Sequence, residues 1–190
     1  MNPEIITVVS GLPRSGTSMM MNMLAAGGMS LLTDALRAAD EDNPKGYFEL
    51  QRVKQLDKDN SWLPEARGKA VKIVSPLLRH LPQQHRYKII FMLRDLNEIL
   101  ASQKQMLIRR GEPTDTVADE KMAQMFRKHL SDIEKWLGEQ ANISVLYVDY
   151  GLVLDDAGRY ARAINAFVSG ELDVEKMASV ADKSLHRQQR

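Results

Sequence analysis

A run of β-branched residues leads directly into a glycine-containing loop and then into a helix, and this order constrains the fold more than any other feature of the sequence. Residues 5–9 read IITVV and stop at Ser10 and Gly11, which predicts a short buried strand. Residues 17–26 are rich in methionine and stop at two glycines, which predicts a helix. A strand that turns at once into a helix is the start of a unit in which parallel strands alternate with helices.

The same alternation continues along the chain. Strands are predicted over 70–74, 87–93 and 143–148, and helices over 49–59, 97–110, 117–139 and 156–168. The segment 87–93 reads YKIIFML and is apolar on both faces, as a central parallel strand is. Asp95 can cap the helix that follows it. Strands separated by helices predict an α/β fold with three layers, α/β/α, around a central parallel sheet.

The overall composition limits what the chain can do. Its 190 residues suit a single domain, 1–190, in which 181–190 are expected to form a flexible tail. With 26 basic and 25 acidic residues the net charge is +1, which argues against a nucleic-acid-coating protein but not against a small anion pocket. The absence of cysteine excludes disulfides, thiolate metal sites and cysteine nucleophiles. Without a signal-peptide pattern or an apolar stretch of roughly 18 residues, we expect a cytoplasmic protein with no membrane span.

The loop between the first predicted strand and its helix, residues 11–18, reads GLPRSGTS. It has the spacing of a phosphate-binding Walker A loop, with Thr17 at the position of the usual lysine. A glycine-containing turn can point backbone N–H groups at an anion, and the helix adds its positive dipole end. Arg14 supplies a charged planar fork suited to phosphate or sulfate oxygens, and Thr17 and Ser18 add hydroxyl donors. The alternative is an ordinary strand–turn–helix connection that carries two glycines.

A second candidate anion site lies at the end of the third predicted strand. Arg94 directly follows this strand, and Ser102 lies eight residues later in the next helix. An arginine at the carboxyl end of a parallel strand faces the crevice in which α/β sheets bind ligands, and Ser102 is about two helical turns along, near the same rim. Alternatively, Arg94 forms a surface ion pair with Asp95 or Glu98, and Ser102 is a hydroxyl on a helix face. Together with the loop, the pair predicts two anion sites on one edge of the sheet.

These two motifs resemble those of the sulfotransferase family, whose members have a P-loop NTPase-like fold and use 3′-phosphoadenosine 5′-phosphosulfate as sulfuryl donor. The resemblance implies that the 3′-phosphate is held by Arg94 and Ser102. It implies that the 5′-phosphosulfate is held by the loop residues Arg14, Ser15, Gly16, Thr17 and Ser18. Weaker matches at 43–49 and 147–156 extend it over most of residues 5–168. The implied activity is transfer of a sulfuryl group to a hydroxyl or amine of a small-molecule or glycan acceptor.

The candidate catalytic residues depart from the eukaryotic cytosolic branch of that family. That branch carries lysine where Arg14 stands, and a catalytic histidine after a Lys-Thr pair, whereas the corresponding segment here, 72–76, reads KIVSP. We therefore expect Arg14 to stabilise the transferring group and the leaving phosphate. Glu49 is the candidate general base, because related bacterial members carry an acidic residue at this position. Alternatively, Glu49 is a helix-terminal glutamate favoured by the helix dipole.

Other charged residues have weaker connections to the site. Lys72, in the middle of a predicted strand, points either to the donor or to a sheet edge, and Lys45 is expected to be a loop charge. His80 is a second candidate base. The other histidines are expected at the surface: His85, His129 and His186. The basic segment 183–190, KSLHRQQR, is either a solvated tail or a cover for the 3′-phosphate.

Two other functions fit parts of the pattern. A nucleotide or small-molecule kinase with a degenerate Walker A loop would use 145–149 as its Walker B strand. A non-catalytic nucleotide-binding module would keep the loop without the family's histidine. No metal site is predicted, because the sequence shows neither histidine pairs at ligand spacing nor clustered carboxylates.

Overall fold

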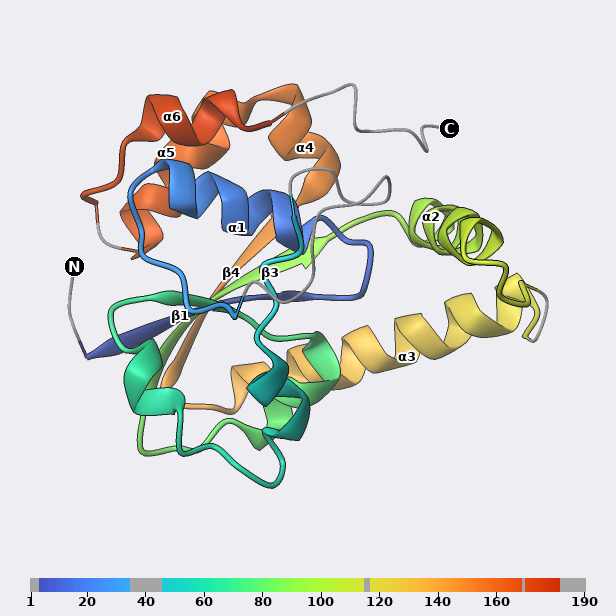
Figure 1. Ribbon diagram of the computed structural model, residues 1–190, viewed down its shortest axis with the longest axis horizontal. Helices are drawn as coiled ribbons and strands as arrows, with labels where there is room; N and C mark the ends of the chain where they lie inside the picture. Colours follow the sequence, from blue (N-terminus) through green and yellow to red (C-terminus); the bar gives the residue numbers. More distant parts are fainter. Residues whose placement is uncertain (1–3, 35–45, 115–116, 169, 182–190) are drawn as a thin grey trace.

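In the part of the chain that the computed structural model describes (residues 4–34, 46–114, 117–168 and 170–181), four parallel strands form one sheet. The strands are β1 (Ile5–Gly11), β2 (Ala70–Lys72), β3 (Arg86–Leu93) and β4 (Ile143–Asp149), in the order β2-β1-β3-β4 (Figure 1). β1 pairs with β2 on one side and with β3 on the other, so that Val9 lies opposite Lys72 and Gly11 opposite Met92. All the strands therefore end at one edge of the sheet.

Helices cover both faces of this sheet (Figure 1). The described α-helices are α1 (Thr17–Ala26), α2 (Leu96–Arg109), α3 (Asp119–Gly138), α4 (Tyr150–Asp155), α5 (Ala157–Val168) and α6 (Val174–Ser179), and the described 3-10 turns are η1 (Gln51–Gln55), η2 (Leu63–Ala66) and η3 (Ser75–His80). α1, α4, α5 and α6 lie over one face, and α3 with the 3-10 turns lies over the other. The predicted three-layer α/β/α fold is confirmed. Among the helices that the structure describes, none is long and apolar enough to cross a bilayer.

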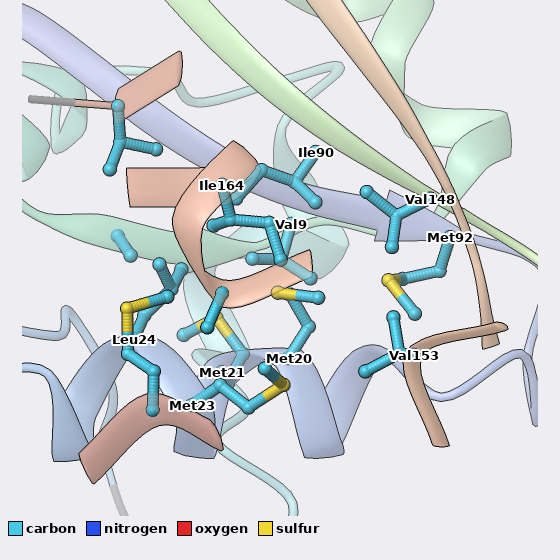
Figure 2. Close-up of a cluster of buried hydrophobic side chains, with 14 of the residues drawn as sticks. Val9, Met20, Met21, Met23, Leu24, Ile90, Met92, Val148, Val153 and Ile164 are labelled. Atoms are coloured by element: carbon cyan, nitrogen blue, oxygen red, sulfur yellow. The ribbon is translucent and has the colours of Figure 1, made fainter. Parts of the chain in front are cut away.

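One apolar core lies between the sheet and α1 (Figure 2). Val9 of β1 and Ile90 of β3 point into it and meet α1 side chains that are fully buried: Met20, Met21, Met23 and Leu24. Ile164 of α5 and Met177 of α6 close this core from the outside. Each such buried side chain stabilises the fold by about 1.5–3 kcal/mol, and unbranched methionine fills the irregular spaces between layers. This packing fixes the direction of α1, whose N-terminus follows the candidate phosphate loop.

A second core lies on the opposite face. Ile6 and Val8 of β1 pack there with Phe91 of β3, Trp62 before η2 and Ile133 of α3. β3 is therefore buried on both faces and paired on both edges, as predicted for a central strand.

The predicted helix over 49–59 is wrong: the structure has only the 3-10 turn η1 there. The buried side chains of this segment are Leu50, Val53 and Leu56, which are spaced three residues apart. This spacing matches the three residues per turn of a 3-10 helix, whereas an α-helix of 3.6 residues per turn would rotate the third side chain away from the core.

The remaining differences concern short elements. β2 ends at Lys72 instead of residue 74, because the chain enters η3 at Ser75. α4 and α6 were not predicted, and each has only six residues. Both begin after an aspartate that accepts a backbone N–H: Asp149 accepts from Leu152, and Asp173 accepts from Lys176.

The expected surface position of His85 is wrong, and His129 is only partly exposed. His85 is only 7% exposed, and His129 of α3 lies with Nε2 2.8 Å from the hydroxyl oxygen of the buried Ser75. Burial lowers the pKa of both imidazoles, and the charge of Arg79 lowers the pKa of His129 further. α3 is thus tied by a side-chain hydrogen bond to the segment that follows β2.

The lowered pKa of His129 predicts a loss of stability in mild acid. The unfolded chain takes up this proton at about pH 6.5 and the folded chain only at lower pH, so stability is complete above that pH and falls as the pH drops through it. Thermal unfolding followed by circular dichroism at about pH 7.5 and about pH 5.5 measures the effect. His129→Gln should reduce the difference between the two melting temperatures. An equal difference in wild type and variant would contradict the assignment, and His80→Gln, at an exposed histidine, is the control.

Candidate functional site

The loop between β1 and α1 depends on two glycines. Gly11 has φ +147°, and a Cβ there would lie 2.5 Å from Ser15 Oγ and 2.7 Å from the carbonyl oxygen of Met92. Gly16 has φ +95° directly before α1, and a Cβ there would lie 2.4 Å from the Tyr150 ring. Both positions therefore require a residue without a side chain. The glycines that indicated a phosphate loop in the sequence are needed for its shape.

Ser15 closes the turn of this loop. Its N–H and its hydroxyl both donate to the carbonyl oxygen of Leu12, at 3.2 Å and 2.7 Å. Ser15 is buried, so in this structure its polar groups stabilise the loop. After Gly16, Thr17 and Ser18 begin the first turn of α1, whose N–H groups have no acceptor within the helix itself. A helix N-terminus of this kind favours a bound anion.

Arg14 carries the charge of the loop from an uncommon backbone conformation. Its φ is +68°, which for a residue other than glycine costs on the order of 1–3 kcal/mol. Its Nε donates to Ser102 Oγ at 2.9 Å, across 88 residues of sequence. The structure thus joins, by a direct hydrogen bond, the two motifs that the sequence predicts on one edge of the sheet.

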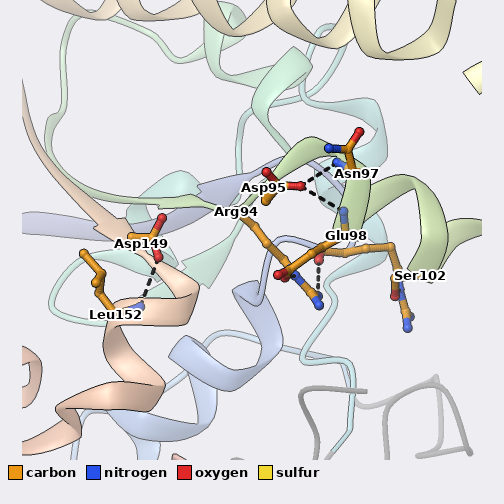
Figure 3. A network of polar contacts seen from close by, with 8 residues as sticks. Arg94, Asp95, Asn97, Glu98, Ser102, Asp149 and Leu152 are labelled. Atoms are coloured by element: carbon orange, nitrogen blue, oxygen red, sulfur yellow. Dashed lines mark hydrogen bonds and ion pairs between the residues drawn. The ribbon is translucent and has the colours of Figure 1, made fainter. Parts of the chain in front are cut away.

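Arg94 lies at the centre of a polar network at the end of β3 (Figure 3). Its Nη1 donates to the carbonyl oxygen of Arg14 at 3.0 Å, and its Nε donates to Glu98 Oε2 at 2.9 Å. The guanidinium carbon lies 4.5 Å from the centre of the Tyr150 ring. Asp95 caps α2, as predicted, and accepts the N–H of Glu98. Arg94 therefore forms one of the ion pairs considered from the sequence and also contacts the loop.

Lys72 lies at the end of β2, on the other side of β1. Its Nζ donates to Ser18 Oγ at 3.3 Å and to the carbonyl oxygen of Tyr47, and it lies 3.9 Å from Glu49 Oε1. The side chain is 10% exposed, and these oxygens compensate the cost of burying its charge. β2 is an edge strand of the described sheet, and from it the Lys72 side chain points toward the loop.

Glu49 is held beside Lys72 by an uncommon turn. Phe48 has φ +52°, and Gly46 before it has φ +90°. Thr33 Oγ1 donates to the carbonyl oxygen of Glu49 at 2.8 Å and fixes the backbone there. Strained residues of this kind cluster at functional sites, where the surrounding structure holds them in place.

The described candidate residues thus come together along the carboxyl edge of the sheet. The charged candidates are Arg14, Lys72, Arg94 and Glu49, and Glu98 joins them as the ion-pair partner of Arg94. His80 is exposed at the end of η3. Lys45, His186 and the segment 183–190 lie outside the described residues. In the described ranges, no group of three or more histidines, aspartates or glutamates could hold a metal ion.

Solved structures with the same architecture include two sulfotransferases and a retinol dehydratase. The sulfotransferase domain of the Synechococcus PCC 7002 olefin synthase matches with a TM-score of 0.57 at 15% identity, over 98% of this chain and 80% of that one. Retinol dehydratase, solved with androsterone and the inactive cofactor PAP, matches with a TM-score of 0.52 at 15% identity, over 97% and 65%. Mouse sulfotransferase SULT7A1, solved with PAP, matches with a TM-score of 0.52 at 16% identity, over 96% and 64%. The chain has the sulfotransferase fold.

The resemblance inferred from two short motifs is therefore confirmed at the level of the fold. No protein-family profile matches the sequence. No curated protein sequence matches it either. The chain spans about two thirds of the length of retinol dehydratase and of the mouse enzyme. At this low identity, the sulfotransferase fold is recognisable mainly from the arrangement of its elements in space.

Tyr150 is a residue of this site that the sequence analysis did not single out. It begins α4 directly after β4, is buried, and lies against both Arg94 and Gly16. In the sequence, Asp149 could have been identified as a helix cap, which would have predicted that β4 ends there and that a helix begins at the carboxyl edge of the sheet. An aromatic residue directly after such a cap is positioned to cover the phosphate loop.

The close approach of Tyr150 predicts that Gly16→Ala destabilises the protein more than a positive φ alone would. Gly28 is a matched control, because its φ is +96° and a Cβ there would meet nothing within 4 Å. Gly28→Ala should cost about 1 kcal/mol, from backbone conformation alone. Gly16→Ala should cost a further 1–3 kcal/mol or so, because the Tyr150 ring must move. Urea unfolding measures both values, and equal losses would show that the ring yields without cost.

Proposed function

We propose that this chain is a sulfotransferase that moves a sulfuryl group from 3′-phosphoadenosine 5′-phosphosulfate to a hydroxyl or amine acceptor. The observation that supports this most directly is the contact of Arg14 with Ser102 and of Arg94 with the Arg14 carbonyl. These contacts bring two cationic motifs, each a candidate anion site, to one rim, as a nucleotide with phosphates at both its 3′ and 5′ positions requires. Two of the structural neighbours were solved with PAP, adenosine 3′,5′-bisphosphate, the product of such a donor.

In this proposal the phosphate loop holds the 5′-phosphosulfate. The N-terminus of α1 and the guanidinium of Arg14 face the transferring group and stabilise the negative charge that spreads over its oxygens. Arg14 stays protonated, so it acts through charge and hydrogen bonds and not as an acid. The leaving phosphate is a weak base and departs without a proton.

The 3′-phosphate is assigned to Arg94 and Ser102. Ser102 accepts the hydrogen bond of Arg14 Nε, which leaves its own hydroxyl hydrogen to donate to a phosphate oxygen. Arg94 is 9% exposed, and a partly desolvated guanidinium binds a dianion more strongly than a solvated one.

Glu49 is proposed as the general base. The acceptor oxygen attacks sulfur, the bond from sulfur to the phosphate oxygen breaks, and the acceptor proton passes to the Glu49 carboxylate. Val74, in the segment where the eukaryotic branch carries histidine, is exposed and cannot accept a proton. Lys72 lies between Glu49 and Ser18 at the start of α1, and in this proposal its charge faces the transferring group.

One observation disfavours the kinase alternative. A Walker B strand over 145–149 would use the Asp149 carboxylate for a magnesium ion, whereas here one of its oxygens, Oδ1, accepts the N–H of Leu152 at 3.0 Å and caps α4. Thr17 also stands where a kinase of this type needs lysine to hold the terminal phosphates.

Replacement of Arg94 tests the nucleotide assignment. Arg94→Ala should weaken binding of adenosine 3′,5′-bisphosphate by roughly 10- to 100-fold, because a charge-assisted hydrogen bond is lost. Binding of adenosine 5′-monophosphate, which lacks the 3′-phosphate, should weaken by a smaller factor, because Arg94 then contributes only its hydrogen bond to the loop. Isothermal titration calorimetry with and without Mg²⁺ measures both, with Arg52→Ala as the control at the exposed Arg52–Glu65 pair. Strict Mg²⁺ dependence and equal affinity for ATP would contradict the proposal.

Replacement of Glu49 tests the catalytic assignment. Glu49→Gln should lower kcat by about 10²- to 10⁴-fold, the usual contribution of a general base, and leave the KM for the donor nearly unchanged. The assay follows release of adenosine 3′,5′-bisphosphate with a panel of phenols, alcohols and amines. Glu65→Gln, which removes a negative charge from η2, is the control. An unchanged kcat would remove Glu49 from this role.

A further inference from the structure

The carboxylate of Glu98 occupies one edge of the guanidinium that the proposed function assigns to the 3′-phosphate. Its Oε2 lies 2.9 Å from Arg94 Nε, and the two side chains are only 16% and 9% exposed. Glu98 lies in the first turn of α2, where the Asp95 cap accepts its N–H. The backbone of Glu98 is therefore held at the start of the helix, from which its side chain reaches Arg94.

Two further contacts hold the Arg94 side chain in place without Glu98. Nη1 donates to the carbonyl oxygen of Arg14, and the flat face of the guanidinium lies over Tyr150. Within the described residues, Nη2 donates to no acceptor, so this end of the fork is available for an anion. Loss of the Glu98 charge would leave the backbone contact and the aromatic contact in place.

The negative charge of Glu98 opposes a phosphate bound at the same guanidinium. A phosphate on the Nη2 end would lie within several ångströms of the carboxylate, in a partly buried setting where charges interact more strongly than in water. We infer that Glu98 lowers the affinity of Arg94 for the 3′-phosphate and so speeds the departure of the bisphosphate product. This inference rests on the proposed function, because it assumes that Arg94 binds this phosphate. In this arrangement Glu98 is a residue that sets nucleotide affinity through Arg94.

The test compares Glu98→Gln with wild type. The glutamine keeps a side-chain oxygen that can accept the Nε hydrogen bond but removes the charge. Affinity for adenosine 3′,5′-bisphosphate should rise about tenfold, with a matching decrease in its dissociation rate measured by stopped-flow displacement. Affinity for adenosine 5′-monophosphate, which lacks the 3′-phosphate, should change less than about twofold. Glu65→Gln, which removes the same charge from an exposed pair in η2, should change neither affinity.

The outcomes separate this inference from the proposed function. A wild-type protein that does not prefer the bisphosphate over the monophosphate overturns the proposed function and the inference together. A wild-type preference, combined with equal or weaker bisphosphate binding by a cooperatively melting Glu98→Gln protein, overturns the inference alone. If Glu98→Gln does not melt cooperatively, Glu98→Asp decides, because it retains the charge but withdraws it by one methylene. This variant should bind the bisphosphate more tightly than wild type by a smaller factor, and unchanged binding would overturn the inference.

Discussion

The hydrogen bond from Arg94 to the carbonyl oxygen of Arg14 is the contact on which the geometry of the site depends. It joins the end of β3 to the phosphate loop at 3.0 Å. The Arg14 carbonyl belongs to a residue in the left-handed region, at φ +68°, a conformation that costs on the order of 1–3 kcal/mol. A hydrogen bond to a charged donor contributes about 1.5–3 kcal/mol, which is enough to offset that strain. The loop therefore keeps its shape because Arg94 lies beside it.

The sheet order places cationic residues on both sides of this loop. β1 lies between β2 and β3. Lys72, the last residue of β2, and Arg94, the residue after β3, therefore lie on either side of the loop that follows β1. Each cation has an acidic partner: Glu49 lies beside Lys72, and Glu98 lies beside Arg94. The charges of these two pairs cancel, as the charges of the whole chain nearly do. An anion bound here would compete with the carboxylates of Glu49 and Glu98 for the two cations.

Much of the fold follows from local patterns in the sequence, whereas the contacts within the site do not. The bounds of α1 match the prediction because Gly16 and Gly27 mark its ends, and the apolar run of β3 is long enough to identify a central strand. The helix predicted over 49–59 is only the short 3-10 helix η1, because the buried side chains of this segment recur every three residues. The Arg14–Ser102 contact spans 88 residues and requires β3 to lie next to β1, which no local pattern specifies.

The ion pairs Arg94–Glu98 and Lys72–Glu49 differ in distance and in the exposure of the carboxylate. Arg94 and Glu98 are joined by a hydrogen bond of 2.9 Å, and Glu98 is 16% exposed. Lys72 and Glu49 are 3.9 Å apart, and Glu49 is 28% exposed. A carboxylate held closely at a guanidinium changes the affinity of that group for anions but has little freedom to take up a proton. A more distant and more exposed carboxylate can reach an incoming hydroxyl and take up its proton. Within the proposed function, this difference is the reason for assigning proton uptake to Glu49 and adjustment of nucleotide affinity to Glu98.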